Sequence, residues 1–138
     1  MTTPRQRMRL ILNGVAMLTA YAAIALATTL LAPAPARAET LTFTVRSNHK
    51  NQVDIAFYSQ NRKGFKWPAD SRAWVLKDSE AHEFKLSCQR GETVCYGAWV
   101  RGSDASYWGV GENDKYSCSG CCYVCEGGAT RTINLNPK

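Results

Sequence analysis

The residues with the clearest capacity for chemistry are the six cysteines, which all lie between positions 88 and 125. Four of them form a C-x-x-C-C-x-x-C run, at Cys118, Cys121, Cys122 and Cys125. Cysteines at this spacing are either oxidised to disulfides or hold a metal as thiolates, and the redox compartment largely decides between the two. The rest of the sequence must therefore indicate where the chain folds.

Residues 1–38 predict a cleaved signal peptide. Arginines near the start are followed by a mostly apolar stretch at positions 10–31 and by two prolines. The sequence Ala36-Arg37-Ala38 has the small-x-small pattern that signal peptidase cuts, which makes Glu39 the first mature residue. Because the apolar stretch is longer than a minimal signal core, an uncleaved membrane anchor is the competing interpretation. We expect a periplasmic or secreted protein with no stable membrane anchor after cleavage.

The net charge of +6 is mostly a property of this N-terminal segment. It contains four of the 17 basic residues and none of the 11 acidic residues, so the remaining chain has 13 basic against 11 acidic residues and a net charge of +2. Nucleic-acid binding normally requires a clustered basic face. We therefore expect no nucleic-acid partner.

Residues 39–138 predict a single cysteine-rich β domain. Strands with one buried face alternate apolar and polar residues. This alternation occurs at positions 41–46, 53–57, 82–88, 94–100 and 131–135, and shorter apolar runs follow at 73–76 and 107–108. Turn residues at 47–51 and 89–92 predict two hairpins, and no stretch has a helical period. We expect an all-β fold, a small antiparallel sandwich or barrel with a disulfide-rich loop.

In an exported chain, six cysteines predict three disulfides. Cys121 and Cys122 are poor partners for each other, because a bridge between neighbours strains the intervening peptide bond, so they should bond to different partners. Two arrangements remain open. Either Cys88 and Cys95 close across their own hairpin while the run pairs internally, or each captures one cysteine of the run and pins the loop onto the sheet.

The alternative is a metal-binding or thiol-active site on Cys118, Cys121, Cys122 and Cys125. Two C-x-x-C units can supply four thiolates to zinc. Zinc sites normally draw their pairs from separated segments, however, and the run departs from the common iron–sulfur spacings. A helix N-terminus favours a redox role for C-x-x-C because it stabilises the thiolate, and the sequence predicts none there. We therefore expect no cofactor, with zinc as the alternative.

Aromatic residues among glycines form the second candidate site. Trp99, Tyr107 and Trp108 lie close to glycines at 97, 102, 109 and 111. Such residues can make a flat platform for a sugar ring or for an apolar side chain of a partner protein. The competing interpretation places them in the core of a small sandwich.

Evidence for catalysis is weak, because His49 and His82 fit no catalytic motif. Asp104, Glu112 and Asp114 lie in polar loop segments and could bind calcium, but their spacing fits no EF-hand loop. The sequence predicts an exported, disulfide-stabilised binding or structural module with an unknown protein or carbohydrate ligand. A periplasmic metal-binding or thiol-active protein is the alternative.

Overall fold

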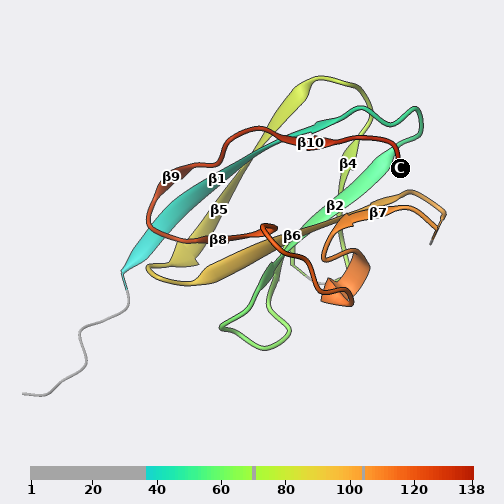
Figure 1. Cartoon of the computed structure of the whole chain (residues 1–138). Helices are drawn as coiled ribbons and strands as arrows, with labels where there is room; N and C mark the ends of the chain where they lie inside the picture. Colours follow the sequence, from blue (N-terminus) through green and yellow to red (C-terminus); the bar gives the residue numbers. More distant parts are fainter. Residues whose placement is uncertain (1–36, 70, 104) are drawn as a thin grey trace, which may run out of the picture. The chain divides into compact units, whose positions relative to one another are not determined.

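The computed structural model describes residues 37–69, 71–103 and 105–138. Within these residues, ten strands and one short 3-10 turn are arranged in two sheets (Figure 1). The predicted signal peptide lies outside the described residues, apart from Arg37 and Ala38. In the same ranges, no helix has the length and apolar character needed to cross a membrane.

The first sheet, sheet A, is centred on its longest strand. It contains β1 (Ala38–Ser47), β5 (Ala81–Gln89), β9 (Gly128–Ala129) and β10 (Ile133–Leu135). β1 pairs antiparallel with β5 along most of its length and parallel with the two short C-terminal strands.

Sheet B is entirely antiparallel in its pairings and is built around two long central strands. It contains β2 (Val53–Ser59), β3 (Lys66–Trp67), β4 (Trp74–Leu76), β6 (Thr93–Val100), β7 (Tyr107–Gly109) and β8 (Cys122–Val124). β2 pairs with β3, β4 and β6, whereas β7 and β8 both pair with β6. The remaining element, η1 (Glu112–Asp114), follows β7.

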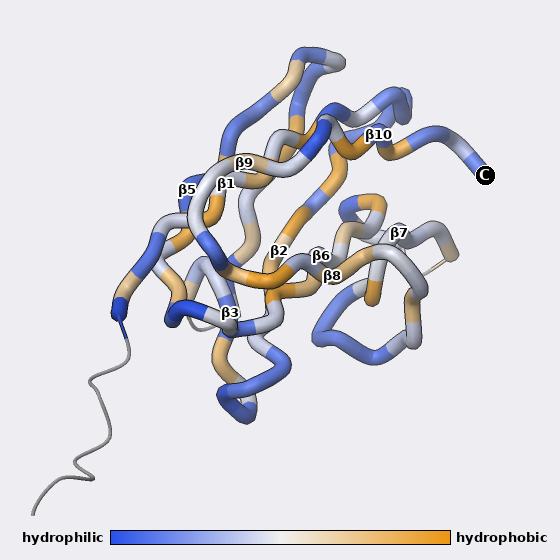
Figure 2. The backbone as a smooth tube through the Cα atoms, turned by 60° about the vertical axis from the view of Figure 1, so that its left-hand side comes forward, coloured by the Kyte–Doolittle hydropathy of each residue, from blue (hydrophilic) through white to orange (hydrophobic). Residues whose placement is uncertain are grey.

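The two sheets enclose one apolar core, which confirms the all-β sandwich. Phe43 of β1 contacts Phe57 of β2 with ring centroids 4.5 Å apart, and Phe57 also contacts Phe84 of β5 at 5.4 Å. Alternate residues of β1 and β5 are buried, as expected for strands with one solvent-facing side. Figure 2 shows apolar residues gathered along β2 and β6 and polar residues at the loop tips.

Both predicted hairpins are wrong. β1 and β2 belong to different sheets, and so do β5 and β6, so the turns at 47–51 and 89–92 cross between the sheets. The alternation in each strand identifies which residues face the core. It does not decide whether two successive strands lie side by side in one sheet or face each other across the core. Here the strands face each other across the core, and this packing buries the apolar faces of both.

The parallel pairing of the C-terminal strands also differs from the expected antiparallel arrangement. The disulfide Cys88–Cys125 holds the start of the C-terminal segment beside the end of β5, which is next to the beginning of β1. From there the segment runs to Leu135, which pairs with Ser47 at the far end of β1. Because it starts where β1 starts, it must run in the same direction (Figure 1).

Candidate functional site

All six cysteines form disulfides, and the arrangement is the one in which Cys88 and Cys95 each capture a cysteine of the run. Cys121 and Cys122 bond to different partners, as expected from their adjacency. The three bonds are Cys88–Cys125, Cys95–Cys122 and Cys118–Cys121.

The three disulfides constrain the chain to different degrees. Their partners are separated by 37, 27 and 3 residues, in the order given. The corresponding losses of unfolded-chain entropy stabilise the fold by about 4, about 4 and about 2 kcal/mol. The first links β5 of sheet A to the end of β8, and the second joins directly opposed residues of β6 and β8. The third, Cys118–Cys121, closes only a local loop.

Held by these bonds, the segment 110–122 lies on the outer face of sheet B and forms a second apolar cluster there. The cluster consists of Ala56, Tyr58, Cys95 and Val110, with Trp99 and Cys118 packed against it. Gly97 permits this close approach, because a Cβ atom at that position would collide with the backbone oxygen of Gly111. β6 is therefore covered on both faces.

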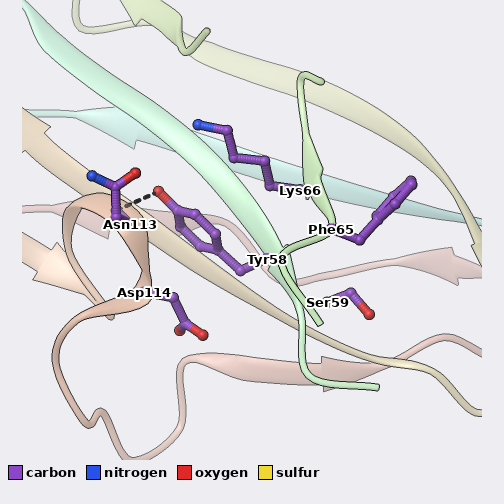
Figure 3. Close-up of a pocket in the computed structure, with 7 residues that line it drawn as sticks. Tyr58, Ser59, Phe65, Lys66, Asn113 and Asp114 are labelled. Carbon is purple, nitrogen blue, oxygen red and sulfur yellow. Dashed lines mark hydrogen bonds between the residues drawn. The ribbon is translucent and has the colours of Figure 1, made fainter. Parts of the chain in front are cut away.

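At the edge of this segment, a cleft of about 330 Å³ opens between η1 and the loop that joins β2 to β3. We call it the Tyr58 cleft. Its lining residues are Tyr58, Ser59, Gly64, Phe65, Lys66, Asn113 and Asp114. Figure 3 shows Tyr58 at its centre, with Lys66 extending above it and Asp114 on the opposite side. The phenyl ring of Phe65, a residue 40% exposed, points away from Tyr58 at the rim.

One wall of the cleft is the η1 turn, where Asn113 and Asp114 have φ angles of 55° and 56°. Residues with a side chain rarely adopt this left-handed conformation, and Asn and Asp tolerate it best. The backbone N–H of Asn113 donates to the Tyr58 hydroxyl at 2.9 Å (Figure 3), and Gln60 Nε2 donates to Asp114 Oδ2 at 2.9 Å. These bonds fix the turn that brings both side chains to the cleft.

The opposite wall is anchored by the buried carboxylate of Glu92. Its Oε1 accepts hydrogen bonds from the Ser59 hydroxyl and from Arg62 Nε, and its Oε2 accepts from Arg62 Nη2 at 3.0 Å and from the Gln89 backbone at 2.8 Å. Burial opposes ionisation, but the bonds from Arg62, Ser59 and Gln89 outweigh it and lower the pKa of Glu92. The Arg62 guanidinium also lies 3.4 Å from the ring centroid of Phe65, which holds the loop in place.

The floor of the cleft is a phenol that stays protonated. Burial raises the pKa of Tyr58 to about 12, the bond from the Asn113 backbone partly opposes the shift, and Glu112 and Asp114 add to it. The hydroxyl oxygen is used as an acceptor by Asn113, so its proton remains available to a ligand. The cleft thus offers donors at Tyr58 and Lys66 and acceptors at Asp114 and Asn113.

The predicted aromatic platform is divided between two faces of sheet B. Trp108 is buried in the main core, where its indole N–H donates to the Asn136 backbone at 2.7 Å. Trp99 and Tyr107 lie on the other face, because neighbouring residues of a strand point in opposite directions. There they line a tight hollow of about 10 Å³ with Tyr116, whose ring stacks on Tyr107 at 3.8 Å.

Both residues of that stacked pair are partly buried. Lys138 Nζ lies 4.6 Å from the ring centroid of Tyr107, and Lys115 Nζ lies 5.2 Å from that of Tyr116. The structure therefore brings Trp99 and Tyr107 together but gives them a packed environment. The open cleft is instead lined by residues around Tyr58 that the sequence did not single out, apart from Asp114.

The four cysteines considered for zinc are distributed over all three disulfides. A zinc site on Cys118, Cys121, Cys122 and Cys125 would require each of these bonds to be reduced first. Across the described ranges, no group of three or more His, Cys, Asp or Glu side chains is arranged to hold a metal ion.

The two histidines lie apart from the Tyr58 cleft. His49 packs edge-on against Trp108 at 5.7 Å, and His82 Nε2 lies 2.7 Å from Asp78 Oδ1. The hydrogen bond from His82 is the main cause of the lowered pKa of Asp78. No family model, no curated protein and no solved structure matches the chain, so its function is inferred from this geometry.

Proposed function

We propose that residues 39–138 form an exported, disulfide-stabilised binding module whose ligand is a small neutral saccharide bound in the Tyr58 cleft. The observation that carries the proposal is a set of polar groups that the fold leaves free at the cleft. Among the described residues, Lys66 has no ion pair or side-chain hydrogen bond, and the Tyr58 proton has no acceptor. Within the part of the chain that the structure describes, the Asp114 side chain accepts a hydrogen bond only from Gln60.

A saccharide fits this arrangement because each of its hydroxyl groups both donates and accepts hydrogen bonds. The cleft provides donors and acceptors on opposite sides, and the charges of Lys66 and Asp114 balance, which favours a neutral ligand over an ionic one. Its volume of about 330 Å³ is at the low end of the range for ligand sites, which favours a small ligand. Phe65 adds an exposed apolar surface at the rim.

Binding rather than catalysis is supported by how the cleft is built. Glu92 fixes one wall and Tyr58 the other, so ligand contacts require little ordering of the protein. The raised pKa of Tyr58 prevents it from acting as a base near neutral pH. Export is supported by the disulfides, since such bonds persist mainly in oxidising compartments.

The test is a titration of the ¹⁵N-labelled, oxidised protein with neutral mono- and oligosaccharides, followed by amide chemical shifts and calorimetry. We expect saturable amide shifts confined to the cleft residues. The variants Asp114→Ala and Lys66→Gln should each bind at least about tenfold more weakly, a loss of about 1.4 kcal/mol of binding free energy. Glu83→Ala and Lys85→Gln, on the exposed face of β5, are matched controls and should bind normally. Saturation with shifts elsewhere, or no saccharide binding, would overturn the proposal.

The metal-binding alternative predicts different chemistry at the cysteines. A native mass that includes zinc, together with titratable thiols, would favour it over the disulfide-stabilised module. The module predicts no free thiol and a mass lowered by the six hydrogens lost in three disulfides.

A further inference from the structure

The Cys118–Cys121 disulfide differs from the other two in position and in what it holds. It joins two cysteines only three positions apart, in a segment without strand pairing, whereas the other bonds join separate strands or sheets. Cys118 is only partly buried and lines an open cleft of about 400 Å³. By contrast, Cys88 is 3% exposed and Cys125 is fully buried.

We propose that Cys118–Cys121 is a site of thiol–disulfide exchange with an external dithiol, and that the other two disulfides are permanent structural bonds. The reductant is defined by its chemistry, as a small dithiol or a dithiol protein of the oxidising compartment. The thiolate of the dithiol attacks Cys118, because Cys118 lines the open cleft whereas Cys121 is only 5% exposed.

The exchange balances in two steps. A thiolate of the dithiol attacks Cys118 Sγ, the bond to Cys121 breaks, and Cys121 leaves as a thiolate that takes up a proton. The second thiol of the reductant then loses its proton and attacks the mixed disulfide at the reductant's own sulfur, which releases Cys118 as a thiolate. The protein gains two electrons and two protons, and the dithiol becomes a cyclic or intramolecular disulfide.

Cys95–Cys122 is the competing target, because both residues line the same cleft and Cys122 is exposed. Attack on Cys122 would release a thiolate at Cys95, which is 1% exposed within an apolar cluster. Cys121 is also buried, so burial disfavours the leaving thiolate in both bonds. The two bonds differ in strand pairing. Cys95 and Cys122 are directly opposed in the β6–β8 pairing, which holds them together for reclosure, whereas Cys118 and Cys121 lie in a segment without strand pairing.

Reduction at Cys118–Cys121 leaves the fold in place. The backbone oxygen of Cys121 still accepts a hydrogen bond from the Tyr96 backbone at 3.1 Å, and Cys122 remains bonded to Cys95. The segment therefore stays attached to sheet B at β8. The expected product is a folded protein with two thiols, able to be reoxidised.

The test uses the oxidised protein, limiting dithiothreitol, rapid alkylation at successive times and mass mapping of each cysteine. We expect Cys118 and Cys121 to be labelled together, at least about tenfold faster than Cys88 and Cys125. The two-thiol species should keep the near-ultraviolet circular dichroism of the native protein. In a Cys118→Ser, Cys121→Ser double variant, the fast labelling phase should disappear and the slow phases remain.

A single rate for all six cysteines, or earlier labelling of the Cys95–Cys122 pair, would overturn the proposal. Loss of the native circular dichroism in the two-thiol species would also overturn it, because that bond would then be a structural one. Mass mapping of the natural sequence decides the question even if the double variant fails to fold. Saccharide binding is a separate measurement, so the two proposals can fail independently.

Discussion

Replacing Glu92 by glutamine tests how firmly the loop wall of the Tyr58 cleft is anchored. The carboxylate is 2% exposed and accepts hydrogen bonds from Ser59, from two nitrogens of Arg62 and from the Gln89 backbone. Glutamine has nearly the same shape, but it removes the negative charge and replaces one acceptor oxygen with an NH₂ group. That group must face a donor, either the Arg62 guanidinium or the Gln89 N–H.

The expected cost follows from these contacts. A hydrogen bond to a charged group contributes about 1.5–3 kcal/mol, and loss of one partner of a buried ion pair costs about 3–5 kcal/mol. The Arg62 side chain is 29% exposed, so water can partly solvate the guanidinium that Glu92→Gln leaves unpaired. Glutamine also keeps one oxygen as an acceptor. We therefore expect the free energy of unfolding to fall by about 3 kcal/mol.

The assay is urea unfolding at pH 7 under oxidising conditions, with the free energy extrapolated to zero denaturant. Glu83→Gln, on the exposed face of β5, is the matched control and should change stability by less than about 0.5 kcal/mol. A loss below about 1 kcal/mol in Glu92→Gln would refute the reasoning, because it would mean that the carboxylate network contributes no more than a surface ion pair.

Other predictions concern pH, crosslinking and the phenol. Folding lowers the pKa of Glu92 below its ordinary 4.5, so ionised Glu92 stabilises the fold fully above that pH. This contribution to the free energy of unfolding is lost as the pH falls through the pKa of Glu92 in the folded state. Urea midpoints measured between pH 7 and pH 3 will show the loss. A Cys88→Ser, Cys125→Ser double variant should lose about 4 kcal/mol in the same unfolding assay, and an unchanged midpoint would contradict the crosslinking argument. Tyr58 should stay protonated until about pH 12 in ultraviolet titration, and Tyr58→Phe should cost about 1 kcal/mol and remove that transition.

Much of the fold is predictable from the sequence because alternation reports directly on which side chains are buried. Leu41, Phe43 and Val45 face the core as expected, and so do Ile133 and Leu135 in the last strand. What alternation does not contain is the partner of each strand. Successive strands belong to different sheets, and β10 pairs parallel with β1. Both features depend on contacts and a disulfide between residues far apart in the sequence.

The candidate site was less predictable for the same reason. Adjacency of Cys121 and Cys122 correctly excluded a bond between them, since that argument is local. The Tyr58 cleft instead forms where a loop after β2 meets a turn some fifty residues later, with Asn113 bonded to Tyr58 across a separation of 55 residues. The Asn113-Asp114 pair, two residues after Gly111, was the available signal, because Asn and Asp tolerate the left-handed conformation found in turns.

The position of the first strand bears on the signal-peptide cleavage that we propose. β1 begins at Ala38, which pairs with Gln89, and the Arg90 backbone N–H donates to the Arg37 carbonyl at 2.9 Å. The peptide bond after Ala38, where we expect signal peptidase to cut, thus lies within a hydrogen-bonded ladder in the folded chain. A protease needs that bond extended and unpaired, so cleavage at the proposed site would have to precede the closing of β1 onto β5. Under this proposal cleavage and folding compete, and a chain that folds first would protect the bond after Ala38.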